Sequence, residues 1–194
     1  RNAGTGASFV FDSVFLGSQA GSQVISASYS NYIGALAARS AINSNYSNFI
    51  GYEAGRNISG SSYSTLIGYR AGLRVPAFGA GIGSNNIIIG TNITLSNNRR
   101  DSINLGGIIF ATGSYSELGG DPLSGSVGNG RVGINVVNPT VEFDVSGSTK
   151  TSGFTILTQV SQSLNFADDT AAAAGGVPLG GLYRSGSTIQ IRLV

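Results

Sequence analysis

A short apolar phrase recurs along the N-terminal half of the chain. It reads SNYIGALA at 30–37, SNFIGYEA at 47–54 and STLIGYRA at 64–71, and its glycines recur every 17 residues. An earlier copy, SVFLG, keeps the same spacing, whereas NIIIG and SINLG are looser later copies. An internal repeat of this kind decides the expected fold before any single residue does. The glycines that end the copies are Gly17, Gly34, Gly51, Gly68, Gly90 and Gly106.

The residues of each repeat favour short strands over helix. Gly, Ser, Asn and β-branched or aromatic residues are poor in helix interiors, and four or five apolar positions between turn residues are typical of a strand. Seventeen residues of strand trace about 56 Å, enough for a flattened coil of two short strands and two tight turns. Such coils stack about 4.8 Å apart through backbone hydrogen bonds. The pattern predicts an all-β β-solenoid (β-roll) over residues 13–111.

Each predicted strand is apolar on both faces. Neighbouring residues of a strand point to opposite sides, yet Phe49 and Ile50 are both large and apolar, and Ile87 to Ile89 are wholly aliphatic. A thin coil has one inside, so the second face predicts burial against other copies of the chain, and three copies around an axis is an economical closure. A neighbouring segment of the same chain is the alternative cover. We expect a core and oligomer stack made of Ile33, Ile50, Ile67, Ile89, Phe49 and Ile87.

The rest of the chain breaks the repeat. Residues 1–12 form a lead-in, and the Gly- and Ser-rich residues 112–130 are predicted to be a loop. A small β module is expected over 131–158, with strands at 132–136, 141–145 and 153–157. In the C-terminal tip, 159–194, a hairpin pairs 182–184 with 188–194. Before it, Asp168 caps either one helical turn or a polyalanine loop.

Composition excludes several classes of protein. Only 10% of the residues are charged and the net charge is +2, too little to indicate binding to nucleic acid. The longest weakly polar stretch, 171–182, is too short and too rich in Gly and Pro to span a bilayer, so no membrane insertion is expected. The chain begins at Arg1 rather than Met, and we expect a piece of a longer protein.

The sequence offers little material for catalysis. It has no His or Cys, which removes the usual base of a nucleophilic triad and the usual transition-metal ligands. Lys150, the only lysine, lies in a polar turn, and the adjacent Asp168 and Asp169 would diverge on a strand. We therefore predict no enzyme, no catalytic residue, no metal and no cofactor. Acids from different copies meeting at an interface remain the one route to a hydrolase.

Two groups of residues are candidates for receptor binding. Tyr52 and Tyr69 are 17 residues apart, so their rings either bind sugars or stack on one another to stiffen the coil. The tip breaks the repeat, and its hairpin concentrates polar and aromatic side chains, although the tyrosine could instead pack beneath it. The tip candidates are Tyr183, Arg184, Gln190 and Arg192.

Three segments resemble known proteins. The SNxIGxxA repeats look like the β-roll heads of trimeric autotransporter adhesins and the GYxAG repeats of bacteriophage fibres. GRVGINVVNPTVEFDVSGS, at 130–148, resembles a module that phage tail fibres carry before their C-terminal tip. FADDTAAAAGGVPLGGLYRSGSTIQIRLV, at 166–194, is similar to an ending common in phage virion proteins. The order of these three segments is more specific than the repeat alone.

The resemblance implies a homotrimeric fibre or spike on a virion. Its partners would be its own copies, other virion tail proteins, and a bacterial surface glycan or protein receptor, which it binds without catalysis. A bacterial trimeric adhesin head on the cell surface is the alternative, and a depolymerase with acids shared between chains is the third. Related fibres often continue into a self-cleaving chaperone domain, which is not found before Val194.

Overall fold

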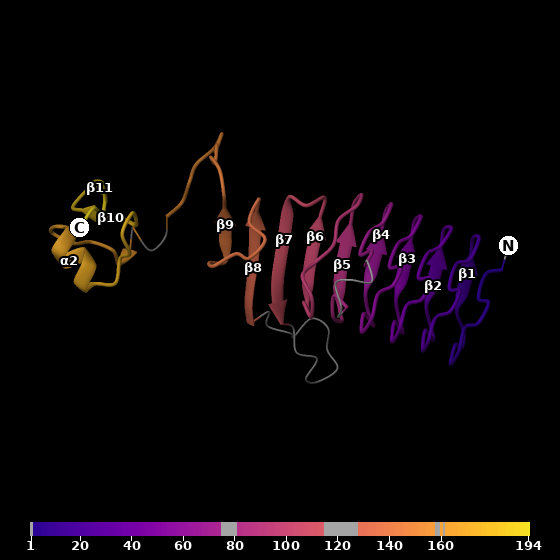
Figure 1. Ribbon diagram of the computed structural model, residues 1–194. Coiled ribbons are helices and arrows are strands. Elements are labelled where there is room, and N and C mark those ends of the chain that lie inside the picture. Colours follow the sequence, from indigo (N-terminus) through magenta and orange to yellow (C-terminus); the bar gives the residue numbers. More distant parts are fainter. Residues whose placement is uncertain (1, 75–80, 115–127, 158–159, 161) are drawn as a thin grey trace. The chain divides into compact units, whose positions relative to one another are not determined.

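The computed structural model describes residues 2–74, 81–114, 128–157, 160 and 162–194, without the side chains of 114, 128 and 129. They form two compact units, 1–148 and 149–194. The first holds one sheet of nine strands that follow one another in chain order (Figure 1). The second holds a two-stranded hairpin and a short helix. The described chain is therefore mostly β, as the sequence predicts.

The repeat builds the first five strands, which pair in parallel. They are β1 (Val14–Leu16), β2 (Asn31–Ile33), β3 (Asn48–Ile50), β4 (Thr65–Ile67) and β5 (Asn86–Ile89). From β1 to β4, each residue pairs with the one 17 positions later, as Phe15 does with Tyr32 and Tyr32 with Phe49. The predicted stacking of 17-residue repeats is confirmed. The second strand expected in each repeat is reduced to isolated bridges that join Ser8, Ile25, Ile42 and Ser59.

The glycine that ends each phrase is required by backbone geometry. Gly51 has a φ of 132°, and a Cβ on it would lie 2.4 Å from the carbonyl oxygen of Gly68 in the next repeat. A side chain at this position would clash with backbone that cannot move aside. The glycine of each phrase therefore lies where the backbones of neighbouring repeats approach closely.

The central residue of each strand forms the core of the repeats. Tyr32, Phe49, Leu66 and Ile88 are fully buried, and the rings of Phe15, Tyr32 and Phe49 stack about 5 Å apart. The Tyr32 hydroxyl donates to the Ser44 carbonyl over 2.9 Å, and burial raises the pKa of this phenol above its usual value. Of the residues expected in the core stack, Phe49 is in the core of the single chain.

The isoleucine stack is not the core of the single chain. Ile50, Ile87 and Ile89 are 36–41% exposed, and Ile33 and Ile67 are half-buried. Each lies next to a buried residue of its strand and so points to the opposite face. The sequence could not decide between the two faces because both are apolar. The single chain therefore does not bury these isoleucines as its core, and their burial as an oligomer stack stays a prediction.

The sheet continues through the last, looser copy of the repeat, SINLG, and past it. It gains β6 (Ser102–Leu105), β7 (Ile109–Ser114), β8 (Gly128–Ile134) and β9 (Phe143–Val145). β7 pairs antiparallel with both neighbours, whereas β9 is parallel to β8. β7 and β8 thus extend into both ends of the predicted loop 112–130, of which 115–127 lie outside the described residues. The strand expected at 153–157 is not formed among the residues described there.

The second unit forms a helix and a hairpin. Helix α2 (Asp169–Ala174) begins at Asp168, whose carboxylate accepts the amide of Ala171 over 2.8 Å, so the helical turn forms rather than the polyalanine loop. β10 (Leu182–Ser185) pairs with β11 (Thr188–Ile191) as expected. Tyr183 packs with Ala172 and Val177 in a small core.

Candidate interaction surface

The outer face of the nine-stranded sheet carries two columns of side chains. One residue from each strand stands in each column, because the register pairs them strand by strand. We call them the aliphatic column and the mixed column. The aliphatic column is Leu16, Ile33, Ile50, Ile67, Ile89, Leu105, Ile109, Ile134 and Val145.

The aliphatic column has no polar member over nine strands. Strands lie about 4.8 Å apart, so the column is about 38 Å long. Leu16 is 63% exposed, and Leu105 and Ile109 are 36% and 38% exposed. The other members are exposed or half-buried, and a partly exposed apolar column of this length is typical of an interaction surface.

The mixed column changes character along the sheet. From β1 to β4 it consists of Val14, Asn31, Asn48 and Thr65, and the Asn31 amide donates to the Asn48 side-chain oxygen over 2.8 Å. From β5 onward it is apolar. Those five residues are Ile87, Ile103, Ala111, Val132 and Phe143.

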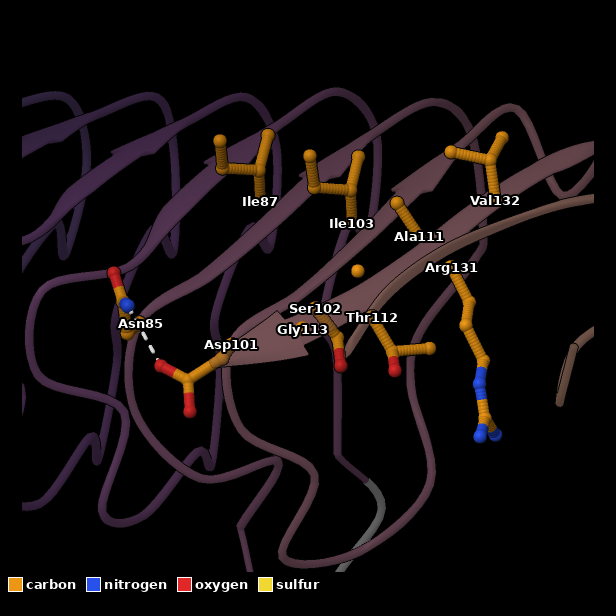
Figure 2. Close-up of a pocket in the computed structure, with 11 residues that line it drawn as sticks. Asn85, Ile87, Asp101, Ser102, Ile103, Ala111, Thr112, Gly113, Arg131 and Val132 are labelled. Carbon is orange, nitrogen blue, oxygen red and sulfur yellow. Dashed lines mark hydrogen bonds between the residues drawn. The ribbon is translucent and has the colours of Figure 1, made fainter. Parts of the chain in front are cut away.

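A shallow hollow of about 260 Å³ opens beside the apolar part of the mixed column. Figure 2 shows Ile87, Ile103 and Val132 pointing to one side of the strands, with small Ala111 between Ile103 and Val132; Gly113 also lines the hollow. At one end the Asp101 carboxylate accepts the Asn85 amide over 2.7 Å. The hollow exists because two small residues leave the sheet backbone uncovered between larger side chains. It is mainly apolar and so extends the apolar outer face.

Exposed tyrosines stack on one another along the repeats. Tyr52 and Tyr69 lie 5.5 Å apart with rings 10° from parallel, and each is 43% exposed. The guanidinium of Arg70 lies 5.0 Å from the Tyr69 ring centroid. Each ring thus covers one face of the other, which leaves less ring surface for a sugar. A receptor-binding role for this pair stays a prediction.

A second column of tyrosines recurs every 17 residues in the sequence. Tyr29, Tyr46 and Tyr63 stack with centroids 5.0 Å apart and are 52%, 49% and 61% exposed. Each has a positive φ near 57°, so the chain turns a corner there. The spacing of 17 gives the column, but the exposure of the rings depends on the corner geometry.

One buried acid lies among the repeats. Glu53 is 3% exposed and binds Arg56 and Arg70, with 2.6 Å to the Nε of Arg70. Burial alone would raise the pKa of the Glu53 carboxyl, but the hydrogen bonds from Arg70 and Arg56 outweigh it and hold the pKa below its usual value. This acid is fully engaged in structure. Its carboxylate oxygens accept hydrogen bonds from the two arginine side chains.

Tyr183 does not present its ring to a receptor. It is 4% exposed, and its hydroxyl donates to Asp169 over 2.7 Å. The hydrogen bond to Asp169 and burial raise the pKa of Tyr183 to about 12. This tyrosine packs in the small core beneath the hairpin, which favours the alternative, and its role as a receptor contact stays a prediction.

The other tip candidates bind the tip's own backbone. Arg184 donates to the Gly186 carbonyl over 2.9 Å, and Arg192 donates to the carbonyls of Val177 and Val194. Gln190 pairs with Tyr183 and is half-buried. The more exposed face of the hairpin is instead apolar, with Ile189 and Ile191 58% and 53% exposed. Receptor binding by Arg184, Gln190 and Arg192 stays a prediction.

Within the described ranges, no three His, Cys, Asp or Glu side chains lie close enough to hold a metal ion. None of the helices described there is long and apolar enough to cross a membrane. The class that the structure defines is a mostly-β protein built on one sheet of stacked short strands. Comparison with protein-family models, curated proteins and solved structures found no match to this chain.

Proposed function

We propose that this chain is a β-solenoid segment of a homotrimeric bacteriophage tail fibre or spike, with an adhesive rather than a catalytic role. It would hold a recognition surface away from the virion and bind the bacterial envelope. The observation that carries the proposal is the aliphatic column. It gives the repeats a second apolar face that the described parts of the chain leave exposed.

Burial of that face between copies supports the trimer. A sheet apolar on both sides is stable when both sides are covered, and closed rotational symmetry lets every copy cover the same face in the same way. Burying nine aliphatic side chains removes several hundred Å² of apolar surface from water per copy, at roughly 25 cal/mol per Å². An interface of this kind suits permanent assembly, as a fibre needs.

The neutral surface and the engaged acids support adhesion without chemistry. Glu53 and Asp169 are two acids that a hydrolase could use. Glu53 is bound to two arginines, and Asp169 is bound to a tyrosine and to backbone amides. The resemblance of the three segments to phage fibre proteins supports the placement on a virion. Partners would be other virion tail proteins and a bacterial surface glycan or protein.

A binding and turnover assay tests the function. The protein is incubated with purified lipopolysaccharide and capsular polysaccharides from a panel of bacteria, and with whole cells. We expect retention on the cells or glycans of one host group, with no release of reducing ends. Release of reducing ends would contradict the adhesive role and indicate a depolymerase. An absence of binding to every host would contradict recognition by this segment.

A further inference from the structure

The two-part mixed column determines how copies of the chain face each other. We propose that copies associate in parallel and in register, and that Asn31 and Asn48 form the polar layer that enforces this arrangement. The inference rests on the proposed assembly through the outer sheet face. Three copies around one axis are parallel by symmetry, so the inference adds the residues that select this arrangement over an antiparallel pair. The partner is another copy of this chain.

The mixed column is asymmetric along the sheet. Its polar part lies at β2 to β4 and its apolar part at β5 to β9. In an antiparallel pairing with full overlap, β2 faces β8 and β3 faces β7. Asn31 would then face Val132, and Asn48 would face Ala111. A primary amide buried without a hydrogen bond costs roughly 1–3 kcal/mol, so this arrangement is disfavoured.

Parallel, in-register pairing removes that cost. Asn faces Asn and isoleucine faces isoleucine at every level of the sheet. Within one copy, the Asn31 amide donates to Asn48, an arrangement that uses one donor of Asn31 and one acceptor of Asn48. The Asn48 amide group and the Asn31 oxygen can then bind the same two residues of a neighbouring copy. A buried asparagine layer fixes register in this way in coiled coils, where it lowers stability but selects one arrangement.

Spin labels measure the orientation directly, because the chain has no cysteine of its own. Ser18→Cys and Thr91→Cys place single labels on exposed residues just after β1 and β5. In a parallel, in-register assembly the distance between labels on different copies is the same for both variants. In an antiparallel one, Thr91 labels stay level while Ser18 labels separate by about 38 Å along the sheet. Unequal distances in the two variants overturn the proposal.

The role of the asparagines needs a second variant. Asn31→Ile/Asn48→Ile removes both side-chain amides from the mixed column and leaves Thr65 as its one polar residue. Thr91→Ile adds an isoleucine away from the column and is the control. The distance between Ser18→Cys labels on different copies is measured in both backgrounds. The double variant should still assemble but show a second, longer distance, whereas the control should show one distance only. A single unchanged distance in the double variant overturns the asparagine layer alone. A monomeric parent protein overturns both this inference and the proposed trimer.

Discussion

At the scale of single residues, backbone geometry explains the repeat better than side-chain chemistry does. The phrase glycine is fixed by the approach of the next repeat, and corner residues such as Tyr46 and Glu53 hold positive φ values near 55°. Residues with side chains usually avoid that conformation. The corners are tolerated because the stacked repeats on either side hydrogen-bond them in place, as when the Tyr46 amide binds the Ser28 carbonyl.

Gly51→Ala should lower the free energy of unfolding by roughly 3 kcal/mol or more, because strain and a backbone clash add together. Gly60→Ala is the matched control. Gly60 also has a positive φ, of 62°, but nothing lies within 4 Å of its Cβ position. Its replacement should cost about 1 kcal/mol. Urea denaturation of both variants gives the comparison, and equal midpoints would contradict the close approach at Gly51.

At the scale of elements, buried serine side chains help set the stacking of the strands. Ser47 donates to the Ser61 carbonyl over 3.0 Å and accepts the Ser64 amide over 3.2 Å. The Ser47 amide in turn binds the Ser30 hydroxyl. Each serine thus provides a hydrogen-bond partner for backbone groups that the short strands do not pair.

Ser47→Ala should reduce stability by about 1–3 kcal/mol, because two buried backbone groups lose their partner. Ser18→Ala, at an exposed position, should change stability by less than about 0.5 kcal/mol. Thermal and chemical unfolding measure both. No difference between the two variants would show that water replaces the Ser47 hydroxyl at no cost.

The tip unit should be sensitive to acid. The Tyr183 hydroxyl and the Leu193 amide bind the Asp169 carboxylate and hold its pKa below its usual value. A lowered folded-state pKa stabilises the unit above the unfolded value, about 3.9, and this contribution is lost as the pH falls through the folded value. The protection of the Leu193 amide, which is its exchange rate relative to the intrinsic rate at the same pH, should therefore fall below about pH 4. In Asp169→Asn, the protection should already be low at neutral pH and should no longer change near pH 4; unchanged protection would contradict the contact.

The sequence predicts the elements that depend on local spacing. It does not predict features that depend on how segments pack against one another. The period of 17 gives the register of β1 to β4, and Asp168 gives the start of α2. It could not decide whether Phe49 or Ile50 faces inward, because both are large and apolar. It also could not show that Tyr183 lies beneath the hairpin, since its burial depends on packing against α2.

At the scale of the whole molecule, the outer sheet face is expected to hold the copies together. Ile50→Asp should leave the fold of each chain intact, because Ile50 is 36% exposed in the single copy. In the assembly, however, it would put an unpaired charge into the apolar interface, at a cost of several kcal/mol. Circular dichroism should stay unchanged while the assembly dissociates. Thr91→Asp, away from both columns, is the control, and an Ile50→Asp protein that still assembled would contradict burial of the aliphatic column.

Light scattering of the unmodified chain at micromolar concentration measures how many copies assemble. If the aliphatic column is buried between three copies, the molar mass will be three times the 19.7 kDa of one chain and will not fall on dilution through that range. A folded protein with the mass of one chain would contradict the proposed trimer, because the outer face of its sheet would then be exposed in the native state.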